Sequence, residues 1–144
     1  MDPDHLKNFE DICRKTGLKI THQRLEIYRE LITAKDHPTA EMLHKRLRLR
    51  LPTLSIDTVY RTLMTFAQHK LANRVETTEH LNRFEVVLAP HHHLVCRSCH
   101  SIVDFTWSAL DQAELPLEVV QWGKIENKVV VIYGTCESCG GLQD

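Results

Sequence analysis

The sequence predicts an α+β protein built as an N-terminal winged helix-turn-helix followed by a smaller C-terminal α/β part. Three observations carry this prediction. Apolar residues recur at helical spacing through residues 4–69, the period then shortens to that of strands, and two C-x-x-C pairs flank β-like segments further on. The chain has 144 residues, 42% hydrophobic and 26% charged, which is ordinary for one globular domain or two small ones.

Four amphipathic helices are predicted in the first part, over residues 4–16, 22–34, 40–50 and 56–69. Gly17 stops the first helix, and Thr21, Thr39 and Ser55 cap the other three. Pro52 prevents the third helix from continuing beyond residue 50. The first part is therefore a bundle of short helices.

The fourth helix divides into an apolar stripe and a polar face. The stripe comprises Val59, Leu63, Phe66 and Ala67, and the polar side carries Asp57, Arg61, Thr65 and Gln68 with Tyr60 at its edge. Three short helices, the last with an arginine on its polar face, resemble a helix-turn-helix whose last helix enters the major groove of DNA. The alternative is an ordinary solvated helix face.

Strands are predicted beyond the fourth helix. Residues 71–76 and 83–87 form a β-hairpin, joined by residues 77–82, of the kind that makes a wing beside a recognition helix. Residues 88–90 are the predicted hinge. The second part then has predicted strands at residues 91–95, 101–105, 117–125 and 128–133, with a short helix at residues 108–115.

The charges are unevenly distributed between the two parts. Residues 1–90 carry 15 Lys and Arg against 12 Asp and Glu, whereas residues 91–144 carry 3 Lys and Arg against 7 Asp and Glu. The net charges of the two parts are therefore +3 and −4, which add to the total of −1. The first part is therefore the candidate binder of a polyanion such as DNA. Solvated charge without a partner is the alternative.

Four of the five cysteines form the pairs Cys96/Cys99 and Cys136/Cys139. Two such pairs separated by a folded module match a structural zinc site with four thiolates. The main alternative, a dithiol redox centre, needs only one pair, usually at the start of a helix. Cys13 lies at helical spacing from Leu6 and Phe9 and is a predicted core residue.

Three consecutive histidines precede the first cysteine pair. Side chains alternate across a strand, so His91 and His93 project from one face and His92 from the other. If the next strand pairs with this one, Asp104 adds a carboxylate to the same site. Imidazoles and carboxylate without thiolate suit Fe(II), Mn(II) or Zn(II), with the oxygen ligand favouring iron and manganese.

The sequence resembles the ferric uptake regulator family along nearly its whole length and in the order typical of that family. The resemblance is carried by residues 17–24 (GLKITHQR), 55–63 (SIDTVYRTL), 90–99 (PHHHLVCRSC) and 133–139 (YGTCESC). It implies a homodimeric, metal-dependent transcription factor that binds double-stranded DNA. The implied domains are a winged-helix DNA-binding domain over residues 1–87, a hinge at residues 88–90, and a dimerisation domain with the zinc site over residues 91–144.

The resemblance also implies roles for single residues. The regulatory metal, Fe(2+) or Mn(2+), would be held by His37, Glu85, His91, His93 and Asp104, while Zn(2+) is structural. DNA contacts are implied for Lys19, Tyr60 and Arg61. We expect Thr58 and Thr65 of the fourth helix to contact DNA as well.

Two departures from the family pattern indicate the branch. At the positions where some members have a further site in the dimerisation domain, this chain has Pro90, His92, Asp111 and Lys128, and we expect that site to be absent. The five-ligand set resembles the peroxide-sensing regulator (PerR) branch, in which bound Fe(II) reacts with peroxide and ligand histidines are oxidised. That branch usually has Asp where this chain has Glu85, so an iron sensor is the alternative.

The expected function is therefore a metal-dependent repressor of palindromic operators, released by peroxide, and not an enzyme. The sequence has no stretch of the roughly 18 apolar residues that a membrane span needs, and its first residues lack a secretion pattern, so a cytoplasmic location without membrane contact is expected. A metalloenzyme with an open coordination position and a zinc-stapled protein interaction module are the distant alternatives.

Overall fold

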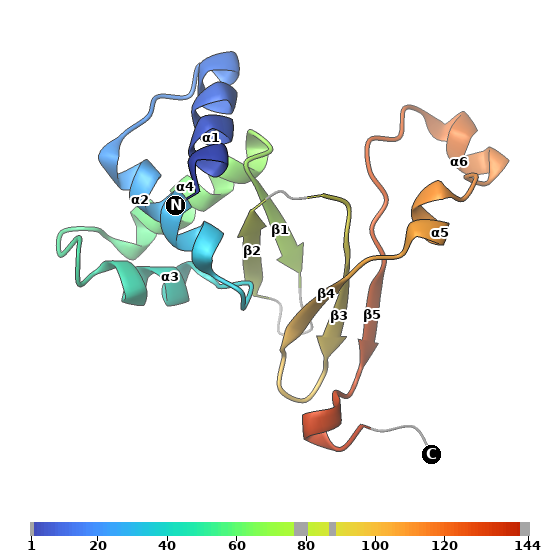
Figure 1. Cartoon of the computed structure of the whole chain (residues 1–144). Coiled ribbons are helices and arrows are strands. Elements are labelled where there is room, and N and C mark those ends of the chain that lie inside the picture. The colour runs from blue at the N-terminus through green and yellow to red at the C-terminus, as the bar shows by residue number, and fades with distance from the viewer. Residues whose placement is uncertain (1, 77–80, 87–88, 142–144) are drawn as a thin grey trace. The chain divides into compact units, whose positions relative to one another are not determined.

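The structure is a computed structural model that describes residues 2–76, 81–86 and 89–141. The chain divides into two compact units, Met1–Val87 and Leu88–Asp144. The elements of both units are drawn in Figure 1. Among the described residues, no helix has the length and apolar character that a membrane crossing requires.

Helices α1 (Pro3–Thr16) and α2 (His22–Thr33) begin and end at the signals in the sequence. Gly17 follows α1 in the left-handed region with φ of 72°, a conformation that glycine adopts without steric cost. Thr21 caps α2, because its side-chain oxygen accepts a hydrogen bond from Arg24 N at 3.2 Å.

Helix α3 (Ala40–Leu47) is shorter than predicted, ending at Leu47 instead of Arg50. The backbone N–H groups of Arg50 and Leu51 both donate to Leu47 O, which turns the chain back toward the core. Leu54, placed by this turn, is buried. Burial of the apolar residues that follow therefore overrides the helix propensity of the last residues.

Helix α4 (Ile56–Gln68) begins at the predicted cap. Ser55 Oγ accepts a hydrogen bond from Thr58 N at 3.1 Å. Because a capping hydroxyl satisfies a helix N–H that otherwise has no partner, Ser55→Ala is expected to lower the free energy of unfolding by about 1 kcal/mol. Urea titration monitored by circular dichroism measures this loss. Ser55→Gly is the matched control, since glycine at this position costs only a few tenths of that amount, and equal losses in the two variants would contradict the capping role.

The core of the first unit is centred on three aromatic rings. Phe9 of α1 stacks on Tyr28 of α2 with ring centroids 4.6 Å apart, and Phe66 of α4 meets both rings edge-on at 5.8 and 5.9 Å. All three side chains are fully buried. Stacked and edge-to-face geometries are the favourable ones for aromatic pairs, so this cluster fixes α1, α2 and α4 against each other.

Strands β1 (Ala72–Glu76) and β2 (Asn82–Val86) pair as an antiparallel hairpin, with Ala72 opposite Val86 and Asn73 opposite Glu85. This confirms the predicted wing. Strand β1 contacts α4, and β2 contacts α2 and α3. Of the predicted connection at residues 77–82, residues 77–80 lie outside the described part, and so does residue 88 of the predicted hinge.

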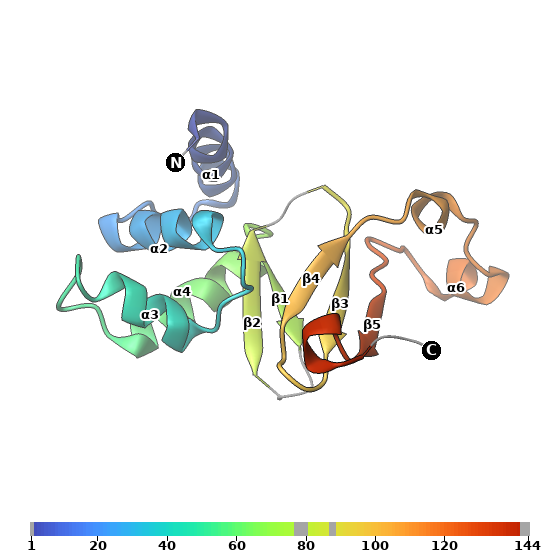
Figure 2. The ribbon, with the colours of Figure 1, turned by 60° about the horizontal axis from the view of Figure 1, so that its bottom comes forward.

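The second unit contains a three-stranded sheet of β3 (His92–Cys96), β4 (Ile102–Phe105) and β5 (Val131–Gly134). The order is β4-β3-β5, with β3 antiparallel to β4 and parallel to β5 (Figure 2). The last strand is shorter than the predicted residues 128–133. The combination of helices with antiparallel and mixed sheets confirms the α+β class.

Helices α5 (Ser108–Gln112) and α6 (Leu117–Trp122) occupy the connection between β4 and β5. The predicted strand at residues 117–125 is wrong. The backbone N–H groups of Val119 and Val120 donate to Pro116 O, and the helix ends before Gly123. Proline before the first turn and glycine after the last are helix-boundary signals, and here they override the strand preference of the two valines.

Candidate functional site

The two cysteine pairs meet at one end of the sheet of the second unit. Strand β3 runs parallel to β5 with Cys96 opposite Gly134, so both strands end on the same side. Cys99 lies in the turn after β3. Cys136 directly precedes the short 3-10 helix η1 (Glu137–Cys139), which follows β5, and Cys139 is the last residue of that helix. Parallel pairing of strands far apart in the sequence thus brings the two pairs together (Figures 1 and 2).

The four sulfurs lie close enough together to bind one ion. Cys99 Sγ and Cys136 Sγ are 3.8 Å apart, and all four sulfurs lie within 4.8 Å of one another. Four thiolates at about 2.3 Å from a tetrahedral zinc are separated by roughly 3.8 Å. The donor set and its spacing therefore fit Zn(2+).

Hydrogen bonds shift the pKa values of Cys96, Cys99 and Cys139 in different directions. Backbone N–H groups of Cys99 and Cys136 lower the pKa of Cys96 to about 6, and the Cys136 N–H lies 3.3 Å from Cys96 Sγ. The Ser101 hydroxyl, 3.1 Å from Cys99 Sγ, lowers the pKa of Cys99. In contrast, the hydrogen bond to Cys136 and the other nearby sulfurs raise the pKa of Cys139 to about 12. Four thiolates are stable together only with a cation between them.

The residues around the sulfurs support the two turns. The guanidinium of Arg97, in the turn between the first two cysteines, lies 5.0 Å from the centroid of the Tyr133 ring. Gly141 donates its N–H to Cys136 O, and a Cβ at this position would collide with Thr135 O. Backbone donors and a close glycine contact therefore shape this end of the sheet.

His91, His93 and Asp104 form a second group in the same unit. His93 lies opposite Asp104 in the β3–β4 ladder, which confirms the predicted strand pairing. Nε2 of His93 and Nε2 of His91 lie 3.5 and 3.9 Å from the same oxygen, Asp104 Oδ1. The two imidazole rings are 4.9 Å apart at an interplanar angle of 85°. Both rings therefore direct a nitrogen toward one carboxylate.

The tautomer of His91 is set by its backbone. Nδ1 lies 3.0 Å from Ala89 O, and because a carbonyl only accepts, Nδ1 must carry the proton. Nε2 is then the nitrogen with the lone pair, on the side facing Asp104. A ring N–H donated to a carbonyl is the usual support for a metal-binding histidine.

His37 and Glu85 form a third group, which lies in the first unit. His37 Nε2 is 2.9 Å from Glu85 Oε2, and both residues are buried. Two ligand atoms about 2.1 Å from one ion at right angles are separated by roughly 3.0 Å. This spacing suits adjacent ligands of an ion as well as a direct ion pair.

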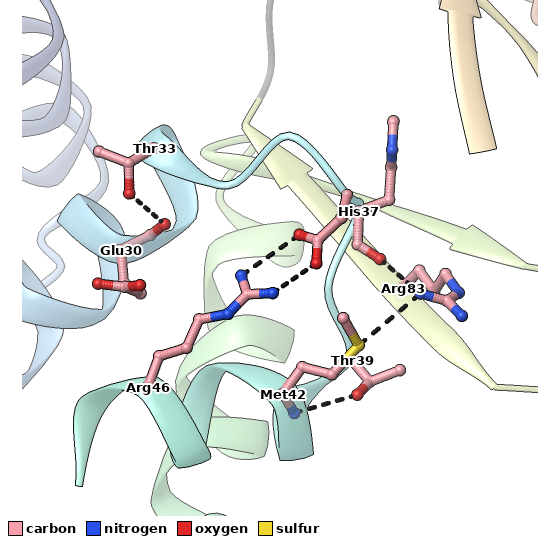
Figure 3. A network of polar contacts seen from close by, with 8 residues as sticks. Glu30, Thr33, His37, Thr39, Met42, Arg46 and Arg83 are labelled. Carbon is pink, nitrogen blue, oxygen red and sulfur yellow. Dashed lines mark hydrogen bonds and ion pairs between the residues drawn. The ribbon is translucent and has the colours of Figure 1, made fainter. Parts of the chain in front are cut away.

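The loop that carries His37 is fixed by neighbouring side chains. His37 has φ of 49°, a left-handed conformation that is costly for a residue with a Cβ. Arg83 Nη1 donates to His37 O at 3.2 Å, and Phe84 N donates to Pro38 O at 2.9 Å. Figure 3 shows the His37 carbonyl directed at Arg83 and its imidazole pointing away from α3.

A second contact holds the start of the same loop. Arg46 of α3 makes two hydrogen bonds to the carboxylate of Asp36, and this guanidinium lowers the pKa of Asp36. Asp36 is thereby engaged with Arg46, so it is a structural neighbour of His37 and does not join the metal-ligand candidates. Two arginines on different elements thus hold the loop of His37 from both sides.

His92 points the other way and has a structural role. Its Nδ1 accepts a hydrogen bond from Val130 N at 3.0 Å, so Nε2 carries the proton and donates to Asp111 Oδ1 at 2.8 Å. Lys128 Nζ donates to the carbonyls of Leu110 and Ala113. Both nitrogens of His92 are engaged with protein groups. These contacts join α5 to the sheet at the positions where we expect a further metal site to be absent.

Four of the five residues predicted to contact DNA line one polar hollow of the first unit. It has a volume of about 430 Å³ and lies between the start of α2 and α4, where it is lined by Lys19, Thr21, Gln23, Arg24, Thr58, Arg61, Thr62 and Thr65. Tyr60, the fifth, is half-exposed beside it, and its hydroxyl lies 3.4 Å from Asn82 Nδ2 of the wing. Arg61 pairs with Asp57 at 2.8 Å, an exposed contact that is weak and easily exchanged for a phosphate or base.

Sequence reasoning missed several residues of these groups. Gln23 and Arg24 join the hollow, and Arg24 Nη1 donates to Lys19 O at 2.6 Å. Their position shortly after Thr21, the cap of α2, could have indicated from the sequence that they lie near Lys19. Asn73 Nδ2 lies 3.3 Å from Glu85 Oε1, and Arg83 reaches the loop of His37. Neither contact has a signal in the sequence, because each depends on strand register and on a loop distant in the chain.

Comparisons with known proteins identify the family of the chain. The sequence model of the ferric uptake regulator family matches residues 15–131. The peroxide operon regulator of Bacillus subtilis (strain 168) is 33% identical over 139 residues, which are 96% of each chain.

Two solved structures are similar in fold. The ferric uptake regulator of Helicobacter pylori, which has three functional metal-binding sites, aligns with a TM-score of 0.78 at 24% identity over 98% of this chain and 95% of that one. The ferric uptake regulator of Pseudomonas aeruginosa, solved with manganese, aligns with a TM-score of 0.74 at 25% identity over 89% and 97%. The chain therefore belongs to the ferric uptake regulator family, a family of metal-dependent transcriptional regulators rather than of enzymes.

Proposed function

We propose that the chain is a metal-dependent transcriptional repressor that binds palindromic operator DNA as a homodimer and releases it when peroxide oxidises the regulatory site. The observation that carries this proposal is the pair of imidazoles facing Asp104, with His91 already in the tautomer that binds a metal. The similarity to the peroxide operon regulator of Bacillus subtilis supports the peroxide step.

The regulatory ion would take ligands from both units. The five proposed ligands are His37, Glu85, His91, His93 and Asp104. Nitrogen and carboxylate donors without thiolate suit Fe(II) and Mn(II). The P. aeruginosa relative was solved with manganese, which supports the same assignment here. The second ion, a structural Zn(2+), would be held by Cys96, Cys99, Cys136 and Cys139.

The polar hollow and the recognition helix α4 are the proposed DNA surface. Lys19 and Arg61 supply cations for phosphates or base edges, Thr58 and Thr65 supply hydroxyls, and Tyr60 supplies an apolar ring beside a polar group. The first part of the chain also carries the net positive charge. The helix would enter the major groove while the wing lies alongside.

The second unit is the proposed dimerisation domain. Trp122, Leu117 and Val120 of α6 are 80%, 70% and 55% exposed in the single chain, and Val103 of the sheet is 55% exposed. Large apolar side chains gathered on one small unit are typical of an association surface. A second copy would cover them through a two-fold interface, which matches a palindromic operator.

Repression would follow from the positions of the ligands in the sequence. His37 and Glu85 precede the predicted hinge at residues 88–90, and the other three ligands follow it. If all five residues bind one ion, they can do so only in one arrangement of the two units, so metal binding would select that arrangement from the ensemble. By linkage, operator DNA must raise metal affinity by the same factor by which metal raises DNA affinity.

Peroxide release is tested on the chain's own promoter. Bound Fe(II) supplies the redox chemistry that activates peroxide. One peroxide oxygen would replace the hydrogen on a ring carbon of His37 or His91, and the other would leave as water. We expect peroxide to dissociate the Fe(II) form from DNA in gel shifts and to spare the Mn(II) form, with mass spectrometry finding one added oxygen on a histidine. Release of both forms, or neither, would contradict peroxide sensing.

An iron sensor without peroxide chemistry is the second candidate. The observation that favours it is Glu85, which is longer than the aspartate usual in the peroxide-sensing branch. It predicts Fe(II)-dependent DNA binding that peroxide leaves intact. We also infer a cytoplasmic location and no enzymatic activity. A hydrolase activity that depended on the non-cysteine metal would support a metalloenzyme, and DNA affinity indifferent to Fe(II) and Mn(II) would support an interaction module.

A further inference from the structure

The two carboxylate oxygens of Glu85 have different partners within the first unit. Oε2 lies 2.9 Å from His37 Nε2, whereas Oε1 lies 3.3 Å from Asn73 Nδ2. Asn73 is on β1, directly opposite Glu85 in the antiparallel ladder. Side chains at such positions are neighbours on one face of the sheet, so the short Asn73 reaches the near oxygen while Glu85 extends to His37.

The hydrogen bond has a defined direction. A carboxylate only accepts, so the group of Asn73 that faces Glu85 must be its NH₂. The bond keeps the plane of the carboxylate in one orientation, with one oxygen toward the wing and one toward His37. Groups that hydrogen-bond to a metal-binding carboxylate are known to fix how it coordinates.

A glutamate can bind an ion through one oxygen or through both, and this choice changes the number of positions occupied. If Glu85 bound through one oxygen, the five proposed ligands would supply five donor atoms and leave room for a sixth. If both oxygens bound, the same residues would supply six donor atoms. An open position is what a small reactant such as peroxide needs.

We propose that Asn73 is a positioning residue that confines Glu85 to coordination through Oε2 and so keeps one position open at the regulatory ion. This inference rests on the proposed function, because it requires Glu85 to be a ligand. It also explains how the longer Glu85 could take the place of an aspartate. Asn73 hydrogen-bonds to Oε1 of the longer side chain, so that Glu85 presents only Oε2 to the ion.

Asn73→Ala tests this inference with two measurements on purified, zinc-loaded protein. We expect the rate of histidine oxidation by peroxide in the Fe(II) form to fall about tenfold, the scale seen when a group that hydrogen-bonds to a metal ligand is removed. The Mn(II) dissociation constant, measured by competition with a fluorescent chelator, should stay constant or decrease, because Glu85 gains a second metal contact. Asn127→Ala, in an exposed loop of the second unit, is the matched control and should change neither quantity.

Each alternative gives a different result. If Asn73 only supported the fold, Mn(II) affinity and the oxidation rate would fall together, and if it had no role, neither would change; both results would overturn the inference. Asn73→Gln keeps an amide donor and should restore part of the oxidation rate. In a Glu85→Asp background, where the carboxylate is one methylene shorter, Asn73→Ala should have little further effect, as a double-mutant cycle can measure.

Failure of the proposed function would be distinguishable. If Glu85→Ala bound Mn(II) as tightly as the unmodified chain, the ligand set itself would be wrong. If Glu85→Ala lost Mn(II) while Asn73→Ala changed nothing, only the positioning role of Asn73 would fail.

Discussion

Cys96→Ser is expected to lose the structural zinc and, with it, the dimer. Structural zinc sites in small modules contribute about 10–16 kcal/mol of apparent binding free energy, which is at least as large as the roughly 5–15 kcal/mol that stabilises a typical domain. Cys96 is buried at the end of β3, and its sulfur accepts a hydrogen bond from the N–H of Cys136. Its loss removes a metal ligand and the link between the ends of β3 and β5.

Elemental analysis and sedimentation velocity measure the two outcomes. The unmodified chain should carry one tightly bound zinc and sediment as a dimer, and Cys96→Ser should carry none and sediment as a monomer or aggregate. Cys13→Ala is the control, because Cys13 is buried in the first unit far along the chain from the zinc ligands. A dimeric Cys96→Ser protein with full zinc content would contradict the structural assignment.

His93→Ala and His37→Ala are each expected to abolish the stimulation of operator binding by Mn(II) while keeping one zinc per chain. Allosteric couplings between ligands are commonly 5–150-fold, or about 1–3 kcal/mol, and removal of one of the five proposed ligands should eliminate this factor. His93 Nε2 faces Asp104 and His37 Nε2 faces Glu85, so each variant removes one nitrogen from one ligand group.

Fluorescence anisotropy with labelled operator DNA, with and without Mn(II), gives the coupling directly. The affinity for DNA without Mn(II) should stay the same in both variants, since neither residue belongs to the proposed DNA surface. His5→Ala on α1 is the control and should retain full stimulation. Loss of zinc in His93→Ala or His37→Ala would show that the two kinds of site had been assigned wrongly.

Local signals predicted the helical first unit well. The caps Thr21, Thr39 and Ser55 and the stop at Gly17 act within a few residues, so they could be identified without knowledge of the tertiary structure. The error at residues 117–125 has a local cause too. Two valines suggested a strand. Pro116 and Gly123, however, mark the two ends of a segment that forms one short helix.

The metal groups were predictable to the extent that each depends on adjacent residues. Two C-x-x-C pairs and alternating histidines specify donors within one turn or strand, and antiparallel pairing of β3 with β4 then adds Asp104. Contacts that depend on strand register were not predictable. The pairing of Asn73 with Glu85 and the reach of Arg83 to the loop of His37 follow from how the wing folds against α2 and α3.

The parallel pairing of β3 with β5 also affects how the chain reaches its folded state. Cys96 and Cys136 are 40 residues apart, and an unfolded chain that brings such distant ends together loses roughly 4 kcal/mol of conformational entropy. If zinc bound the thiolates before the strands pair, its binding free energy would offset this entropy loss. The bound zinc would then hold β5 beside β3 in the correct register. Folding of the second unit during synthesis would then depend on zinc binding. The supply of zinc to newly made chains would therefore limit the amount of folded protein.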